Sequence, residues 1–177
     1  MILYIHGYNS SPNSAKAKFF KKIFPNFISG SYDVNSPKLA IKQLSDTIKK
    51  NNVNFIIGSS LGGLYATILS QKFNIPALLI NPLITDVSAD LYKHFNLNSS
   101  YIEEAKDISK NIIDITNINE DLLTIFLSKN DELLPYTLTD KKFKKAKKYY
   151  FDDSHRFIYI KKYKDLILDI TEHNLFK

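Results

Sequence analysis

Several residue types are missing or scarce in this chain of 177 residues. It contains no cysteine, which excludes disulfide bonds, thiolate nucleophiles and cysteine-ligated metals. Arg156 is the only arginine, and sequence-specific readers of nucleic acid usually depend on its planar, bidentate side chain. The apolar run Met1–Ile5 is interrupted by His6 and Gly7, and no run approaches the roughly 20 residues of a membrane span. These absences predict a cytoplasmic protein with no membrane span and no nucleic-acid partner.

The formal net charge is +6, and it comes almost entirely from lysine. A lysine-rich surface attracts anionic partners, such as the phosphates of an acyl-CoA or an acidic carrier protein. The densest basic run is Lys141–Lys148, and such runs are more typical of a solvated helix face. Because lysine is abundant throughout the chain, we favour the ordinary surface over a docking site.

Short apolar runs alternate with helical patterns, which predicts an α/β fold with a mostly parallel sheet flanked by helices. The expected strands are Met1–Ile5, Ser31–Val34, Val53–Ile57, Ala77–Ile80, Leu122–Leu127 and Lys148–Phe151. Helices are expected at Ser14–Phe24, after an N-cap at Ser36, at Leu61–Phe73, at Thr137–Lys147 and near the end of the chain. Residues 86–120 have helical patches but no comparable strand, so we interpret them as a short helical insertion over the site. No linker or repeat divides residues 1–177, which predicts a single domain.

The segment Gly58-Ser59-Ser60-Leu61-Gly62 is a G-x-S-x-G motif placed between an expected strand and an expected helix. In that context a serine stands on a sharp turn with its hydroxyl raised above the sheet. A phosphate-binding turn is the alternative, but a Walker-type loop needs a lysine where Leu64 stands. Ser60 occupies the central position of the motif, so we predict Ser60 rather than Ser59 as the nucleophile.

A serine hydroxyl needs a general base beside it, and the chain offers four histidines. His155 follows the last expected strand, where an α/β-hydrolase places its base. His94 lies in the insertion and His173 near the end of the chain, and isolated histidines there are typical of surfaces. His6 ends the first strand and is better explained as part of a loop. His155 is therefore the predicted base.

The acid that orients the histidine is expected after the strand that precedes the histidine strand. Asp131 is the first acid past Leu122–Leu127, although a turn aspartate is a common alternative. The order Ser60, Asp131, His155 is that of α/β-hydrolases and differs from the orders in chymotrypsin and subtilisin. The three positions therefore predict a catalytic triad.

The tetrahedral intermediate of such a reaction needs an oxyanion hole. One expected donor is the backbone amide of Leu61, directly after the nucleophile. The other is the amide of Tyr8, with His6 and Gly7 shaping its loop.

The opening segment Leu3–Pro12, followed by Ser14-Ala15-Lys16-Ala17, resembles that of the YqiA-like family of small bacterial α/β-hydrolase esterases. Ile57–Gly63 and Asn81-Pro82 are similar to the same family, and Asp131-Glu132 and His155 fall where it keeps its acid and base. The resemblance spans nearly the whole chain and is weakest across residues 86–120. It implies a compact α/β-hydrolase fold and a cytoplasmic hydrolase of carboxylic esters or acyl thioesters, without a metal or an organic cofactor.

The chain departs from that family beside its predicted acid and base. Asn130 stands where glycine often precedes the acid, and Asp152 and Asp153 stand where glycines usually precede the histidine. Asparagine and aspartate tolerate positive φ better than most residues, so these turns survive. The two acids are nevertheless rivals of Asp131, and their charge favours the imidazolium form of His155.

Three functional readings remain open at this point. The first is a serine esterase acting on a small-molecule ester or an acyl-CoA-like thioester through an acyl-enzyme. The second keeps the chemistry but places the acyl group on an acidic carrier protein. The third is a hydrolase fold retained as a catalytically silent binding module, against which the complete set of triad residues argues.

Overall fold

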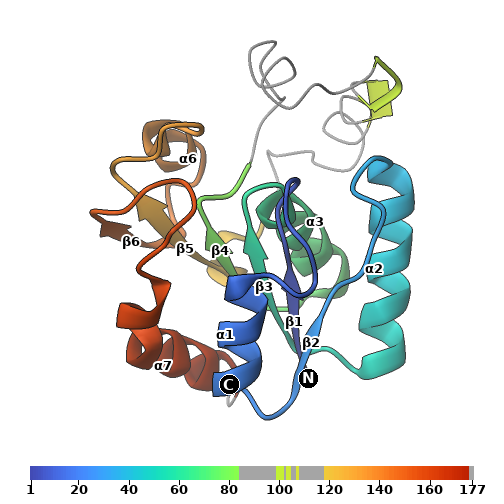
Figure 1. Ribbon diagram of the computed structural model, residues 1–177, viewed down its shortest axis with the longest axis horizontal. Coiled ribbons are helices and arrows are strands. Elements are labelled where there is room, and N and C mark those ends of the chain that lie inside the picture. The colour runs from blue at the N-terminus through green and yellow to red at the C-terminus, as the bar shows by residue number, and fades with distance from the viewer. Residues whose placement is uncertain (84–98, 102, 105–106, 108–117, 176–177) are drawn as a thin grey trace.

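A computed structural model of the chain describes residues 1–83, 99–101, 103, 104, 107 and 118–175. Its centre is a six-stranded sheet in which every pairing is parallel, with the strand order β2-β1-β3-β4-β5-β6 (Figure 1). The strands are β1 (Ile2–Ile5), β2 (Phe27–Ser29), β3 (Phe55–Ser59), β4 (Ala77–Ile80), β5 (Leu123–Ser128) and β6 (Lys147–Phe151). The fold is α/β, as the sequence predicts.

Helices cover both faces of the sheet, because successive side chains of each strand point to opposite sides. Leu3 and Ile5 of β1 pack in a core with α2 (Pro37–Asn51) and α3 (Leu61–Phe73). Ile2 and Tyr4 pack instead in a second core with α1 (Ala15–Ile23) and α7 (Lys164–Leu175). Burial on both faces explains why the central strands are continuously apolar.

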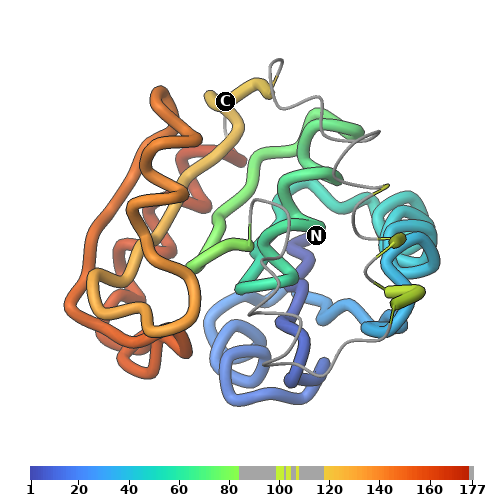
Figure 2. The backbone as a smooth tube through the Cα atoms, turned by 90° about the horizontal axis from the view of Figure 1, so that it is seen from above, coloured from blue at the N-terminus to red at the C-terminus, as the bar shows by residue number. Residues whose placement is uncertain are grey.

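Shorter elements complete the fold at the β5–β6 end of the sheet. These are the 3₁₀ helices η2 (Glu120–Leu122) and η3 (Ile160–Tyr163) and the helix α6 (Tyr136–Lys142). Seen from above, α2 lies at one end of the molecule and the segment that contains α6 at the other (Figure 2). Among the described residues, no helix is both long enough and apolar enough to cross a lipid bilayer.

The second strand was expected at Ser31–Val34, and the structure places it earlier, at Phe27–Ser29. Phe27 and Ile28 pair with Ile2 and Leu3 of β1. Residues 31–34 pair with none of the described strands, and the backbone amide of Asn35 donates to the side chain of Asp33 at 2.9 Å. These residues therefore belong to a loop.

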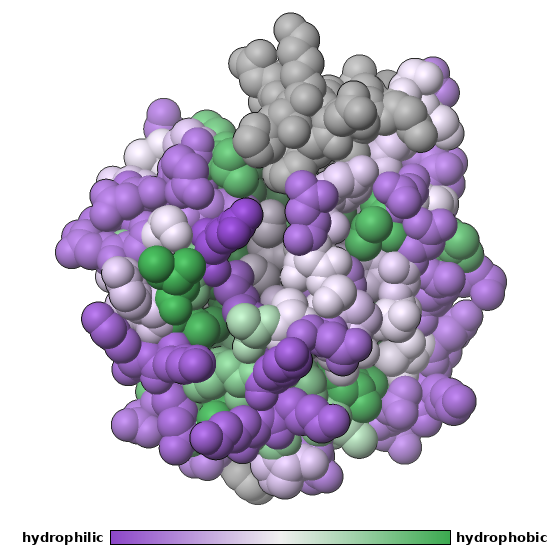
Figure 3. All heavy atoms as spheres, viewed as in Figure 1, coloured by the Kyte–Doolittle hydropathy of each residue, from purple (hydrophilic) through white to green (hydrophobic). Residues whose placement is uncertain are grey.

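The lysine-rich helix was expected to reach Lys147, but α6 ends at Lys142 and Lys147 already begins β6. Because β6 is the edge strand, its side chains stay partly exposed and lysine is tolerated there. Lys148 is not solvated, since its ammonium donates to Asp140 Oδ1 at 2.8 Å and to the carbonyl of Phe143 at 2.5 Å. The basic run is thus neither one helix nor uniformly exposed, and hydrophilic side chains are spread over much of the face in Figure 3.

Ser36 is the N-cap residue of α2, as expected, but the capping hydrogen bond comes from a distant side chain. The Ser36 side chain makes no capping bond and donates instead to Glu104 Oε2 at 3.1 Å. The same carboxylate oxygen accepts the backbone amide of Lys38 at 3.2 Å, and Lys38 Nζ lies 2.6 Å from Asp107. Most of the insertion expected at 86–120 lies outside the described residues, but this described part is helical and docks on the start of α2.

The parallel arrangement brings the carboxyl ends of the strands to one edge of the sheet. The segments that leave this edge contain His6 and Gly7 after β1, Ser60 after β3, Asn81 after β4, Asp131 after β5 and His155 after β6. In open parallel sheets this edge is where ligands bind. The fold therefore gathers most of the predicted site residues in one region.

Close packing of α3 against β1 depends on Gly62. A Cβ atom at this position would collide with the backbone carbonyls of Ile5 and His6. We expect Gly62→Ala to lower the free energy of unfolding by about 2 kcal/mol or more, since rigid backbone cannot move aside. Gly30→Ala is the control, because its Cβ would meet the end of the flexible Leu44 side chain, at 2.8 Å. Urea unfolding measures both, and equal losses would contradict the argument.

Candidate active site

Ser60 stands at the junction between β3 and α3 with φ 56° and ψ −122°. A positive φ is costly for a residue with a Cβ atom, and such strain persists only where the surroundings impose it. The Ser60 amide donates to the carbonyl of Ile80 at 3.0 Å, and its own carbonyl accepts the amides of Gly63 at 2.8 Å and Leu83 at 3.0 Å. These three bonds fix the backbone on which the hydroxyl stands.

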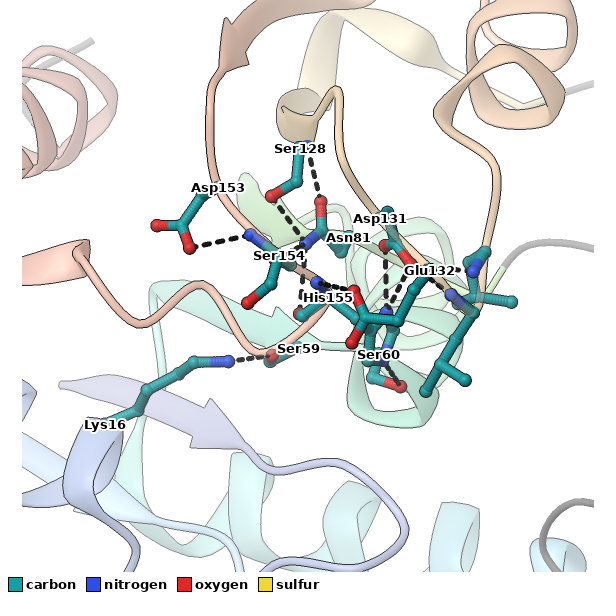
Figure 4. A network of polar contacts seen from close by, with 12 residues as sticks. Lys16, Ser59, Ser60, Asn81, Ser128, Asp131, Glu132, Asp153, Ser154 and His155 are labelled. Atoms are coloured by element: carbon teal, nitrogen blue, oxygen red, sulfur yellow. Dashed lines mark hydrogen bonds and ion pairs between the residues drawn. The ribbon is translucent and has the colours of Figure 1, made fainter.

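The structure brings Ser60, His155 and Asp131 together in one chain of hydrogen bonds (Figure 4). His155 Nε2 lies 2.9 Å from Ser60 Oγ, and His155 Nδ1 lies 2.8 Å from Asp131 Oδ2 and 3.0 Å from Oδ1. The His155 and Asp131 side chains are only 9% and 1% exposed. A carboxylate can only accept a hydrogen bond, so Nδ1 carries the proton that it donates to Asp131. Nε2 is then unprotonated and can accept the proton of Ser60.

The Asp131 carboxylate is also held from its own loop. Its Oδ1 atom accepts the backbone amides of Leu133 at 2.9 Å and Leu134 at 2.7 Å. The Asp131 amide donates to the carbonyl of Ser128, the last residue of β5, at 3.3 Å. The loop thus presents the carboxylate to the imidazole in one orientation.

The two rival acids have different surroundings. The buried Asp153 carboxylate accepts the backbone amides of Ser154 at 2.8 Å and of Ile158 and Tyr159 at 3.0 Å each. Asp153 therefore orders the loop that carries His155, and Figure 4 shows its carboxylate directed away from the imidazole. Asp152 is exposed. Of the three aspartates, Asp131 is the one that contacts the imidazole.

The loop after β1 lies directly against Ser60. A Cβ atom on Gly7 would come within 3.2 Å of Ser60 Cβ. His6 Nδ1 donates to the Gly7 carbonyl at 2.9 Å, and its ring stacks on Tyr32 at a centroid distance of 4.7 Å. Burial lowers the pKa of His6, so His6 acts as a neutral part of this loop. Tyr8, which follows Gly7 in this loop, carries one of the two amides predicted for the oxyanion.

The two remaining histidines are not part of this arrangement. His173 is exposed on α7, and His94 lies outside the described residues. His173 lines a polar cavity of about 500 Å³ at the amino ends of β5 and β6, together with Glu120, Lys145 and Lys147. That cavity opens at the edge of the sheet opposite to Ser60. Among the residues that the structure describes, no three His, Cys, Asp or Glu side chains group closely enough to hold a metal ion.

Sequence reasoning missed Lys16, whose ammonium donates to Ser59 Oγ at 2.8 Å from α1 (Figure 4). Ser59 is buried, so the rival serine of the motif is engaged on the far side of the turn from His155. Burial lowers the pKa of Lys16 to about 8, although the charges of Asp153 and Asp131 act in the opposite direction. Nothing in the spacing of α1 distinguishes Lys16 from the other lysines of that helix.

Glu132 was also missed as a site residue in its own right. Its Oε2 atom accepts the backbone amide of His155 at 2.9 Å, and this hydrogen bond lowers the pKa of Glu132. The segment after β5 therefore makes two contacts with His155: Asp131 binds its imidazole, and Glu132 binds its backbone amide. In the sequence, only the position of Glu132 directly after Asp131 indicated that it could belong to the site.

The lowered pKa of Lys16 predicts a pH-dependent stability. Below about pH 8 the ammonium is charged in both states, and its burial costs folding free energy. Between about pH 8 and 10.5 the folded protein releases the proton while the unfolded chain keeps it, so this cost disappears. We expect the free energy of unfolding of the wild type to rise relative to that of Lys16→Met from about pH 7 to about pH 10. Urea unfolding at both values measures the difference; a constant or falling difference would contradict this.

The chain is similar to known proteins over most of its length. The model of the uncharacterised protein family UPF0227 matches residues 1–172. The UPF0227 protein YE1706 of Yersinia enterocolitica is 30% identical over 145 residues, covering 76% of this chain and 77% of that protein.

Solved structures share the fold at much lower identity. Alpha/beta hydrolase domain-containing protein 10 from mouse has a TM-score of 0.76 at 16% identity, covering 97% of this chain and 89% of the other. A Paleococcus ferrophilus monoacylglycerol lipase has a TM-score of 0.71 at 12% identity, covering 98% and 94%. The Pyrococcus furiosus esterase Pf2001 has a TM-score of 0.66 at 18% identity, covering 97% and 80%. The expected α/β-hydrolase fold and the YqiA-like resemblance are both confirmed, and the chain belongs to the UPF0227 family.

Proposed function

We propose that this protein is a serine hydrolase that cleaves carboxylic esters or acyl thioesters through an acyl-enzyme intermediate. The observation that carries the proposal is the continuous line of hydrogen bonds from Asp131 through His155 to Ser60, at 2.8 and 2.9 Å. An esterase and a monoacylglycerol lipase among the proteins of similar structure support the same chemistry. A turn aspartate or a surface histidine would not need to meet the raised serine of a G-x-S-x-G turn.

In the first half of the reaction, His155 Nε2 takes the Ser60 proton as Oγ attacks the carbonyl carbon of the substrate. The tetrahedral intermediate collapses when the imidazolium gives this proton to the leaving alcohol or thiol. In the second half, water attacks the acyl-enzyme with His155 again as the base, and the free acid leaves. Asp131 keeps the Nδ1 proton in place and stabilises the imidazolium in both halves.

The developing oxyanion is assigned to the backbone amides of Tyr8 and Leu61. Leu61 begins α3, so its amide lies at the positive end of the helix dipole. The close approach of Gly7 to Ser60 supports the Tyr8 assignment, because it brings the β1 loop within reach of the reacting carbonyl. Two preorganised amides at this point would supply much of the rate enhancement.

The expected substrate is a small-molecule ester or an acyl-CoA-like thioester. Labelling of the purified protein by a fluorophosphonate probe tests the serine chemistry. A series of p-nitrophenyl esters and acyl-CoA thioesters of increasing chain length then defines the acyl group. Absence of both labelling and turnover would reject the hydrolase in favour of a binding module.

Removal of the nucleophile gives the first functional prediction. We expect Ser60→Ala to fold normally and to lower kcat by about 10⁴-fold or more, as for nucleophiles of other triads. Ser59→Ala is the control, because its hydroxyl bonds Lys16 rather than His155. Steady-state ester hydrolysis and probe labelling measure both. Activity that survives in Ser60→Ala but is lost in Ser59→Ala would show that Ser59, and not Ser60, is the nucleophile.

The three aspartates give a second functional prediction. Asp131→Asn should lower kcat by about 10⁴-fold, because the wrong imidazole tautomer is then favoured. Asp152→Asn should leave kcat close to that of the wild type, because Asp152 is exposed and Asp131 is the acid that contacts the imidazole. Asp153→Asn should instead lower the free energy of unfolding, because three backbone amides share its carboxylate.

Steady-state ester hydrolysis and urea unfolding of the three variants distinguish these effects. A nearly normal Asp131→Asn enzyme beside an inactive Asp152 or Asp153 variant would show that another acid orients the base.

A further inference from the structure

Asn81 occupies a buried position at the carboxyl end of β4 that the proposed chemistry leaves without a role. It is 3% exposed and adopts the left-handed conformation with φ 43°. Asparagine is one of the few residues that tolerate this conformation. The turn directs the side chain across the edge of the sheet, towards the segments that follow β5 and β6 (Figure 4).

The carboxamide of Asn81 is joined to the strand that carries the acid. Asn81 Nδ2 donates to Ser128 Oγ at 2.9 Å, and the backbone amide of Ser128 donates back to Asn81 Oδ1 at 2.8 Å. Ser128 is fully buried, and its carbonyl accepts the Asp131 amide that begins the acid turn. The starting point of the Asp131 loop is therefore fixed relative to β4.

The same amide group is joined to the loop that carries the base. Asn81 Nδ2 also donates to the carbonyls of Ser154 at 3.2 Å and His155 at 3.0 Å. The two amide hydrogens are thus shared among three acceptors. The His155 peptide is held on both sides, since its amide donates to Glu132 and its carbonyl accepts from Asn81.

The backbone beside Asn81 holds the nucleophile. The carbonyl of Ile80 accepts the Ser60 amide, and the Ser60 carbonyl accepts the Leu83 amide. Four residues, 80–83, therefore contact Ser60 through the main chain and the acid and base segments through one side chain. Among the described residues, Asp131 and Glu132 also join the segment after β5 to the segment after β6, and they belong to the first of these segments. Asn81 joins the two segments from a third strand.

We propose that Asn81 is a positioning residue that sets the mutual distances of Ser60, His155 and Asp131. The inference rests on the proposed function, because it assigns Asn81 a role in that same site. Asn81 touches neither the reacting atoms nor the imidazole, so it acts through the backbone of the His155 loop. A misplacement of about 1 Å in such a site costs roughly 100-fold in rate.

Two substitutions separate the carboxamide from the backbone conformation. Asn81→Asp keeps the shape and the acceptor for the Ser128 amide, but it places a carboxylate oxygen against the carbonyls of Ser154 and His155. Asn81→Gly keeps the left-handed backbone without strain and removes the side chain altogether. Asn74→Asp and Asn74→Gly are the matched controls, because Asn74 is an exposed asparagine with φ 53° at the end of α3.

Steady-state hydrolysis of a p-nitrophenyl ester should show kcat lowered by about 100-fold in Asn81→Asp and about 10-fold or more in Asn81→Gly. KM should change by no more than about threefold, and both Asn74 variants should stay within about twofold of the wild type. If both Asn81 variants keep kcat within twofold, the inference is overturned. If Asn81→Asp does not fold, Asn81→Gly alone decides.

Proton NMR provides a readout that does not depend on turnover. The His155 Nδ1 proton, bonded to Asp131, should give a downfield resonance in the wild type and in both Asn74 variants. It should shift or disappear in the Asn81 variants while their backbone amide spectra stay dispersed. An unchanged resonance in both Asn81 variants would overturn the inference. If the wild type hydrolyses no ester, the proposed function fails, and the resonance still decides whether Asn81 positions the imidazole.

Discussion

The rest of the molecule depends on one constraint, the parallel pairing of the strands in the sheet. Five of these strands, β1, β3, β4, β5 and β6, lead into segments of the candidate site. Every strand leaves the sheet at the same edge, so residues far apart in sequence meet there. Ser60, Asp131 and His155 come from three such exits. The helices on both faces bury the strands, and the edge itself stays available for polar side chains.

Polar groups at this edge are paired in a way that makes the site rigid. Buried donors and acceptors are costly when left alone, and a satisfied network fixes one arrangement. Asp153 accepts three backbone amides of the segment after β6, and Glu132 accepts the amide of His155. Asn81 donates both to Ser128 at the end of β5 and to the carbonyl of His155. The strained turn at Ser60 is held by main-chain bonds on either side of the residue. Stability and geometry of the site therefore come from the same bonds.

Two elements show where local sequence misleads. A strand was expected at 31–34, yet pairing with β1 uses the less polar Phe27 and Ile28, and the later residues form a side-chain-stabilised turn. The lysines after Lys142 continued a helical composition, but Lys147 pairs with Thr124 of β5. Lysine is compatible with an exposed helix face and with a partly exposed edge strand, so lysine content does not distinguish the two.

The sequence by itself determined the α/β class, the G-x-S-x-G turn at Ser60 and the strand-end positions of Asp131 and His155. Each of these follows from local composition and chain order, which are visible without a fold. Only the tertiary structure decided that Asp131 rather than Asp153 meets the imidazole, and that Lys16, Glu132 and Asn81 support the site. Lys16 and Ser59 are 43 positions apart, and Asn81 and His155 are 74 apart. Hydrogen bonds between such distant residues depend on strand order and loop direction, and no local pattern of residues encodes either.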